Sequence, residues 1–194
     1  HRTVPGDSDT SQNRPAPEDF HEAMEGMSYT ETAQYFLKIF PELPHTVEEI
    51  KKEWYDMSVD KYTKEVTLKP GVKEFLEMLK EKGIRTGIAT SNDRKLVEEF
   101  IKARQITHLF DTICTRCEVN KGKPAPDVYL YACSHLHVQP QECYAVEDSP
   151  NGIHSAYSAG CKVFMVPDLT QPDAELEKFI YKKVESLVAL KEYF

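Results

Sequence analysis

The chain has 194 residues, of which 40% are hydrophobic and 29% are charged, and its formal net charge is −8. This length and composition are typical of one globular domain, or of a core with a small inserted domain. Because an acidic chain repels phosphate backbones, we do not expect a nucleic-acid partner. A run of about 18 apolar residues is absent, so we expect neither a membrane span nor a membrane partner.

The five cysteines are scattered and odd in number, which favours reduced thiols and a cytoplasmic location over a disulfide framework. Cys114 and Cys117 form a C-x-x-C pair that can bind a metal, but without a second pair we expect them to be small apolar fillers. Residues 1–17 are polar and Pro-rich, and we expect an irregular lead-in without a signal peptide. Because the sequence starts with His1 and not Met, we expect either processing or a start inside a longer gene product.

Residues 18–67 are predicted to form a compact helical piece. Ser28-Tyr29-Thr30-Glu31 has the S-x-x-E pattern of a capping box and opens a helix that continues through Phe40. Thr46-Val47-Glu48-Glu49 repeats this pattern before a second helix. The apolar residues Ile50, Trp54 and Met57 follow at helical spacing.

From residue 68 to residue 194, short apolar runs alternate with amphipathic helices. Strands are predicted at 84–90, 110–115, 143–147 and 162–166, and helices at 72–82, 95–103, 127–137 and 152–159. This alternation predicts an α/β fold, with a parallel sheet covered by helices on both faces. Ligands of such sheets bind beyond the carboxyl ends of the strands, so the residues that follow each strand are the candidates for function.

Two of these strand ends carry possible phosphate ligands. Thr90, Ser91 and Asn92 offer hydroxyl and backbone N–H donors to an anion, although a plain helix N-cap is an open alternative. Lys123 lies in a loop in which two prolines fix its direction, and a fixed ammonium is useful where charge builds on a phosphoryl oxygen. A solvated basic loop is the alternative for this lysine.

The third strand ends in two acids, Glu147 and Asp148. Adjacent carboxylates repel each other and need a counter-charge. Mg²⁺ suits them because it takes oxygen ligands and keeps waters for a phosphate group. A surface acidic turn remains the alternative.

Taken together, these segments resemble the haloacid-dehalogenase-like (HAD) superfamily, and within it the β-phosphoglucomutase-like phosphatases with a small helical cap. G-I-A-T-S-N resembles the second motif of that family, G-K-P-A-P-D-V-Y the third and E-D-S-P-N-G-I the fourth. The resemblance implies a cap at 18–67 and a Rossmann-like core at 68–194. It also implies Thr90 and Lys123 as catalytic phosphate-binding residues, and Asp148 as the Mg²⁺ ligand with Glu147 beside it. The expected substrate is a small phosphorylated metabolite, a sugar phosphate or a nucleotide, hydrolysed through an aspartyl phosphate.

The first motif of the family, an apolar strand followed by D-x-D-x-T, has no clear counterpart. Asp7 and Asp9 spell D-x-D-x-S, but Val4 is the only aliphatic residue before them, so a polar tail with two chance aspartates is the alternative. A segment outside this sequence is a third source of the nucleophile. Without the central strand, its two neighbours lose hydrogen-bond partners at about 1–3 kcal/mol for each buried group, so something else must fill the slot.

Residues of the helical piece bear on specificity. Tyr29 stands where the resembling phosphomutases carry an arginine for a second phosphate, which favours a phosphatase over a mutase. A surface aromatic is the alternative for Tyr29. We expect Trp54, Tyr55 and Tyr62 to belong to the core of this piece and not to a stacking platform. A catalytically impaired binding or regulatory protein on the same scaffold, and a truncated chain, remain alternatives to an active phosphatase.

Overall fold

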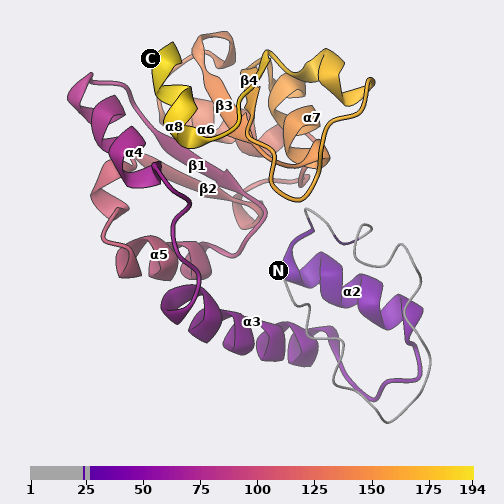
Figure 1. Cartoon of the computed structure of the whole chain (residues 1–194). Coiled ribbons are helices and arrows are strands. Elements are labelled where there is room, and N and C mark those ends of the chain that lie inside the picture. Colours follow the sequence, from indigo (N-terminus) through magenta and orange to yellow (C-terminus); the bar gives the residue numbers. More distant parts are fainter. Residues whose placement is uncertain (1–23, 25–26) are drawn as a thin grey trace.

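The computed structural model describes residue 24 and residues 27–194. In this part of the chain, two helices form one unit and the remaining elements form an α/β unit (Figure 1). The α/β class predicted from the sequence is confirmed, since its strands are parallel and alternate with helices.

The first unit consists of α2 (Tyr29–Ile39) and α3 (Val47–Lys64), and we call it the α2–α3 unit. Both predicted capping boxes are present, one built on Ser28 and the other on Thr46. The residues buried between the two helices are Ala33, Ile50 and Trp54. Met57 was expected on the same face, but it is 49% exposed, because the apolar face of α3 does not extend that far.

The α/β unit contains the other helices and all the strands of the described residues. Its helices are α4 (Val72–Glu81), α5 (Arg94–Ala103), α6 (Asp127–His135), α7 (Pro150–Ala159) and α8 (Leu187–Leu190). Its strands are β1 (Gly87–Thr90), β2 (Thr112–Thr115), β3 (Tyr144–Glu147), β4 (Lys162–Met165) and β5 (Lys182–Lys183). The sequence predicted four of these strands and four of these helices, but not β5 or α8.

The first two strands are shorter at their start than the apolar runs that predicted them. Thr86, just before β1, donates its backbone N–H to the side chain of Asp111 and its hydroxyl to the carbonyl of Leu109. Here the two segments are joined by these side-chain hydrogen bonds and by one backbone hydrogen bond, from the N–H of Asp111 to the carbonyl of Thr86 over 2.8 Å, and the regular strand begins only at Gly87.

The strands form two parallel sheets, with orders β1-β2 and β3-β4-β5. Gly87 lies opposite Thr112 in the first sheet, and Tyr144 lies opposite Lys162 in the second. Among the described residues, no strand joins the two sheets, and β1 is the strand nearer to β3 (Figure 1). Within the described residues, the parallel strands are thus interrupted between β1 and β3.

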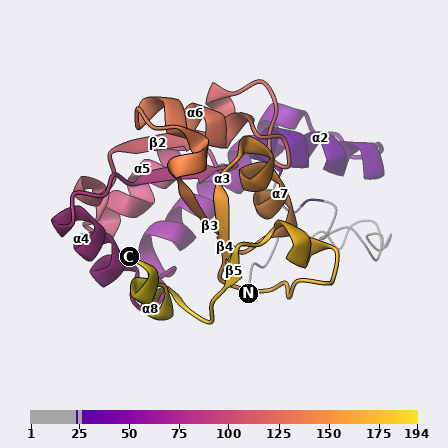
Figure 2. The ribbon, with the colours of Figure 1, turned by 90° about the horizontal axis from the view of Figure 1, so that it is seen from above.

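The second sheet lies between two helical layers. Helices α6 and α7 cover one face, whereas α4 and α8 cover the other (Figure 2). Between them, Val163, Phe164 and Met165 of β4 are at most 1% exposed. Helix α6 also packs on β1 and β2, so one apolar cluster spans both sheets and holds them together.

All five cysteines are free thiols. Cys114 is buried in the apolar cluster under α6 and α7, as expected for a small filler, and Cys133 and Cys161 are buried there too. Cys117 was expected to be a filler as well, but it is exposed, because it lies in the short 3-10 turn (Arg116–Glu118) that follows β2. Within the described ranges, no helix is both long and apolar enough to cross a membrane.

Candidate active site

An ion pair at the carboxyl end of β3 forms the centre of the candidate site. Lys123 Nζ and the hydroxyl of Tyr129 both donate to Oε1 of Glu147. The side chains of Lys123 and Glu147 are 10% and 7% exposed, and the ammonium lies 5.1 Å from the centre of the Tyr129 ring. Burial and the neighbouring Glu147 carboxylate raise the pKa of Tyr129 well above its ordinary value, so its hydroxyl remains a donor at neutral pH.

The local sequence explains why the Glu147 side chain points inward. Side chains alternate between faces along a strand, and Ala145 and Glu147 share the buried face of β3 that packs on α6 and α7. Gly152, near the start of α7, provides the necessary space. A Cβ atom at this position would lie 2.0 Å from Oε2 of Glu147.

The loop that carries Lys123 is fixed at several points. The backbone N–H of Lys121 donates to Oδ2 of Asp127 over 3.2 Å, at the start of α6. The hydroxyl of Ser155, in α7, donates to the carbonyl of Ala125 over 2.6 Å. The Lys123–Pro124 peptide bond is cis. The ammonium is therefore held by its loop as well as by Glu147, and the solvated-loop alternative is wrong.

Asp148 follows Glu147 directly and is exposed. Within the described ranges, no group of three or more His, Cys, Asp or Glu side chains could hold a metal ion. Mg²⁺ often uses only one or two protein carboxylates and completes its shell with water and phosphate oxygens. The Asp148 carboxylate fits such a ligand, whereas Oε1 of Glu147 is already shared by an ammonium and a hydroxyl.

Residues 90–92, which we call the β1 loop, continue from the end of β1. The hydroxyl oxygen of Thr90 accepts the backbone N–H of Asn92 over 3.1 Å. The N-cap of α5 is Asp93, whose side chain accepts the N–H of Lys95 over 3.0 Å. The alternative that the β1 loop serves only as a helix cap is therefore wrong.

The structure links some of the predicted site residues and leaves others apart. Lys123 and Glu147 are in direct contact, and Asp148 is adjacent in the chain. In the part of the chain that the structure describes, no hydrogen bond joins the β1 loop to Lys123 or Asp148. Asp7 and Asp9 lie outside the described residues. A single pocket that unites Thr90, Lys123 and Asp148 stays a prediction.

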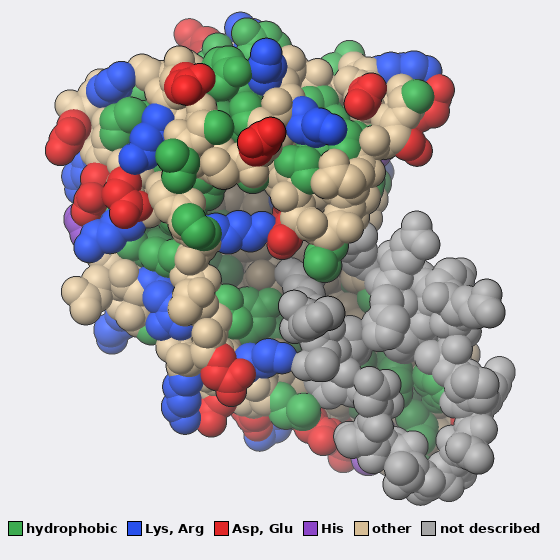
Figure 3. Space-filling view, in the orientation of Figure 1, with side chains coloured by type: hydrophobic (Ala, Val, Ile, Leu, Met, Phe, Trp, Pro, Cys, Tyr) green, Lys and Arg blue, Asp and Glu red, His purple; other side chains and the backbone are tan. Residues whose placement is uncertain are grey.

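A cavity of about 270 Å³ lies between the α2–α3 unit and the start of α5. Its walls include Tyr29 from α2, Lys51 and Tyr55 from α3, and Asp93 and Lys95 from the α/β unit. The surface is hollowed between the two units on this side of the molecule (Figure 3). Tyr29, the predicted specificity residue, therefore lines this cavity together with Asp93, the residue that follows the β1 loop.

The three aromatic residues expected in the core of the α2–α3 unit differ in their surroundings. Trp54 is 7% exposed and belongs to that core, as predicted. Tyr55 instead lines the cavity, with Lys95 Nζ 5.6 Å from its ring centre, because it projects from the side of α3 that faces α5. Tyr62 packs edge-to-face on Phe100 of α5, with ring centres 6.2 Å apart.

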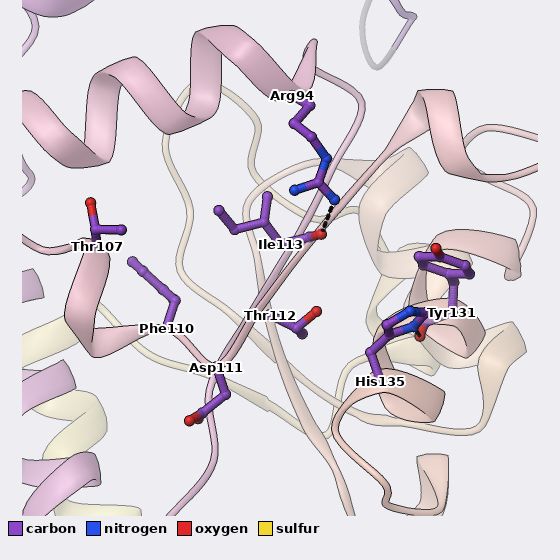
Figure 4. A pocket seen from close by; sticks show the side chains of 8 residues that line it. All are labelled: Arg94, Thr107, Phe110, Asp111, Thr112, Ile113, Tyr131 and His135. Atoms are coloured by element: carbon purple, nitrogen blue, oxygen red, sulfur yellow. Dashed lines mark hydrogen bonds between the residues drawn. The ribbon is translucent and has the colours of Figure 1, made fainter.

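A second cavity, of about 300 Å³, lies along β2 and is lined by none of the predicted site residues (Figure 4). On one wall, the Arg94 guanidinium donates to the carbonyl of Ile113 over 2.6 Å. On another, the rings of Tyr131 and His135 lie 4.1 Å apart. We assign no part of the phosphate chemistry to this cavity.

Sequence reasoning missed two features of the site. It did not single out Tyr129, although this residue ends the G-K-P-A-P-D-V-Y segment, because no local pattern indicates its contact with Glu147. It also missed the contact in which Arg116 Nε and Nη2 donate to Oε1 of Glu31, over 3.1 and 3.0 Å. These two residues are 85 positions apart, so no local pattern could indicate the contact.

Comparison with known proteins places this geometry in a family. The family model described as haloacid dehalogenase-like hydrolase matches residues 8–166. A phosphorylated carbohydrates phosphatase from Thermotoga maritima is 29% identical over 187 residues, which are 94% of this chain and 86% of that protein. The protein YhcW of Bacillus subtilis is 35% identical over 123 residues, 63% of this chain, and the match spans only 56% of the length of YhcW.

Solved structures agree with these sequence relations. The structure of CbbY from Rhodobacter sphaeroides in complex with phosphate superposes with a TM-score of 0.76 at 25% identity. The superposition covers 90% of this chain and 80% of the CbbY chain. The family model matches well over half of the sequence, including all of the candidate site from the β1 loop to Asp148. The chain therefore belongs to the haloacid dehalogenase-like hydrolase family.

Proposed function

We propose that this chain is a phosphatase that hydrolyses small phosphomonoesters with the help of Mg²⁺. The observation that carries the proposal is the buried ammonium of Lys123, held by Glu147 beside the exposed carboxylate of Asp148. A lysine buried to this degree needs a charged partner, and its ammonium lies at the carboxyl end of β3, where ligands of such sheets bind. The Thermotoga relative, named as a phosphatase of phosphorylated carbohydrates, supports sugar phosphates as the substrate class.

Each residue of the site would have its own electrostatic role. Lys123 would neutralise charge on the phosphoryl oxygens, and Glu147 and Tyr129 would hold its ammonium in place. The β1 loop would add hydroxyl and N–H donors to the same oxygens. Asp148 would hold Mg²⁺, which when bound supplies further positive charge to the phosphoryl group.

The reaction itself needs a carboxylate that attacks phosphorus. In the proposed sequence, a carboxylate oxygen forms a bond to phosphorus, and the bond from phosphorus to the ester oxygen breaks. The leaving oxygen takes a proton from a neighbouring acid. Water then cleaves the aspartyl phosphate, which releases inorganic phosphate and restores the carboxylate. Asp7 and Asp9 are the candidates in this sequence for the attacking group and the acid.

A binding or regulatory protein on the same scaffold is the second candidate, and it also has an observation in its favour. Glu118, beyond β2, is bound by Arg94 and Thr115, and Glu147 is bound by Lys123. Neither carboxylate is free to attack phosphorus. Such a protein would bind phosphate at Lys123 but would not turn over an ester.

Phosphate release separates the two candidates. We would incubate the full chain with p-nitrophenyl phosphate and with a panel of sugar phosphates and nucleotides, with MgCl₂ or with EDTA. The proposal expects Mg²⁺-dependent release that falls about 100-fold or more in Asp148→Asn. Asp168→Asn is the matched control, because Asp168 pairs with Lys69 at the surface, where both side chains are about half exposed.

The outcomes of this assay are distinct. Phosphate binding without release from any ester would reject the phosphatase and support the binding protein. If the chain is active, mass spectrometry of an acid-quenched sample should find one phosphoryl group, on Asp7 or Asp9. A phosphoryl group on another residue would reject the assignment of these two aspartates.

A further inference from the structure

Besides the ring contacts of Tyr55 and Tyr62 with α5, hydrogen bonds from two arginines of the α/β unit join it to the α2–α3 unit and the segment that follows α3. At the end of α3, where the chain passes from one unit to the other, Arg104 of α5 donates to the backbone carbonyls of Thr63 and Val66, each over 2.9 Å. At the start of α2, Glu31 forms the ion pair with Arg116, which follows β2. The first attachment fixes the hinge between the units, and the second fixes the end of α2 that carries Tyr29.

The Arg116 side chain uses all three of its nitrogens. Nε and Nη2 donate to Oε1 of Glu31, and Nη1 donates to the carbonyl of Val119 over 2.9 Å. The side chains of Arg116 and Glu31 are 24% and 36% exposed, so water screens this pair only in part. An anchored, planar guanidinium of this kind holds a carboxylate in one orientation.

The Glu31 carboxylate has a second task inside α2. Its Oε2 atom accepts the backbone N–H of Ser28 over 2.9 Å and the Ser28 hydroxyl over 2.7 Å. Partial burial opposes ionisation of Glu31, but the hydrogen bonds from Ser28 and Arg116 outweigh it and keep its pKa below the ordinary value. One carboxylate therefore caps the helix with one oxygen and binds the α/β unit with the other.

The stem of Arg116 rests on the loop that carries Lys123. A Cβ atom on Gly122 would lie 2.8 Å from both Cδ and Nε of Arg116. Gly122 immediately precedes Lys123, so the contacts run without a break from Ser28 through Glu31 and Arg116 to the lysine loop. No group in this series belongs to the phosphate ligands described above.

We propose that Arg116 is a positioning residue that couples the placement of α2 over the site to the loop that carries Lys123. The proposal rests on the proposed function, because it assigns Arg116 an effect on substrate selection by that site. Tyr29 follows Ser28 directly and lines the cavity between the units. Tyr29 would contact the non-phosphate part of the substrate, and Lys123 would contact the phosphate. Arg116 thus sets the position of Tyr29 relative to Lys123.

Amide hydrogen exchange tests this coupling without any need for turnover. The reporters are Thr32 in α2, whose N–H donates to the carbonyl of Ser28, and Ala125 in the lysine loop, whose N–H donates to the carbonyl of Gly122. In Arg116→Met, we expect both amides to exchange about three- to fivefold faster than in the wild type. The amide of Ile50 in α3 is the internal reference and should not change.

Further variants separate coupling from local effects. Gly122→Ala pushes on the Arg116 stem from the loop side and should speed exchange at Thr32 as Arg116→Met does. Ser28→Ala removes the helix cap but leaves the ion pair, so it should affect Thr32 and not Ala125. Lys64→Met, which breaks an exposed ion pair with Asp60 in α3, is the matched control and should affect neither amide. Exchange at Thr32 that stays at the wild-type rate in Arg116→Met would overturn the proposal.

Kinetics add a readout that a purely structural role would not change. In Arg116→Met, KM for a sugar phosphate should rise several-fold, while kcat and KM for p-nitrophenyl phosphate stay within about twofold. Arg116→Lys should restore part of the loss, because it keeps the charge but not the planar contact. Equal losses for both substrates would contradict a role in selection. A wild type without turnover would reject the proposed function, and the exchange experiment alone would then decide the coupling.

Discussion

The strands of the α/β unit differ sharply in how deeply they are buried. In β4, three consecutive residues are at most 1% exposed, with helices on both faces. In β1, no residue is fully buried, and in β3 Val146 is 39% exposed. Glu147, on the buried face of β3, lies beside β4 and holds Lys123, whereas the β1 loop extends from the less buried β1.

This difference shows what the site requires from the fold. A buried ammonium and carboxylate stay in place only if neither partner can relax toward water, and the packing of α6 and α7 around Glu147 prevents this. The β1 loop offers neutral donors that water can also satisfy, so it tolerates a less protected strand. The charged pair of Lys123 and Glu147 is therefore held where the side chains are most densely packed. The following substitutions test this interpretation.

The largest effect is expected from Gly152→Ala. The new Cβ atom would overlap the Glu147 carboxylate, with 2.0 Å to Oε2 and 2.2 Å to Cδ. Since this carboxylate is buried and bound to Lys123, we expect the free energy of unfolding to fall by about 3–5 kcal/mol. Chemical denaturation measures the change. Ser158→Ala, at an exposed position of the same helix, is the control and should change stability by less than about 0.5 kcal/mol.

A matched pair of valines on neighbouring strands of the second sheet compares the buried strand β4 with the exposed face of β3. Val163 of β4 is 1% exposed and Val146 of β3 is 39% exposed. Val163→Ala should lower the free energy of unfolding by about 2 kcal/mol, because it leaves a cavity between packed layers. Val146→Ala should lower it by less than about 0.7 kcal/mol, since 39% of the surface of Val146 stays exposed to solvent. Equal losses of stability would show that the Val146 side chain is buried in solution, and that β3 and β4 do not differ in burial.

A smaller effect is expected from Tyr129→Phe. This change removes one of the two donors to Oε1 of Glu147 but leaves Lys123 in place. We expect a loss of about 1–2 kcal/mol, the usual result when a buried acceptor loses one partner. Tyr157→Phe, on the exposed face of α7, is the control and should be neutral. A neutral Tyr129→Phe would mean that the hydroxyl does not contribute to holding the carboxylate.

Much of the fold could be predicted because its signals are local. The two capping boxes in the α2–α3 unit fixed where both helices begin, and helical spacing of apolar residues predicted α4, α5, α6 and α7. The strands β3 and β4 were visible as apolar runs between turn residues. By contrast, β5 consists of two exposed lysines, and pairing with β4 makes it a strand. No apolar pattern can indicate such an element.

The residues of the candidate site could be predicted from the sequence, but the contacts between them could not. Lys123, Glu147 and Asp148 were predicted because they follow predicted strands and lie in segments that resemble the third and fourth motifs of the family. The sequence suggested a metal as the partner of Glu147, whereas the structure pairs it with Lys123 and Tyr129. Such pairs join residues that are 24 and 18 positions apart, and only the packing of α6 against β3 brings them together.

The central claim is that the buried ammonium of Lys123 binds a phosphoryl group. The most direct measurement is the affinity for inorganic phosphate, in the presence of MgCl₂, of the wild type, Lys123→Met and Lys121→Met. Lys121 is exposed in the same loop and serves as the matched control. We predict that Lys123→Met weakens phosphate binding about tenfold or more, and that Lys121→Met changes it by less than about twofold. Equal affinities of all three proteins would contradict the claim.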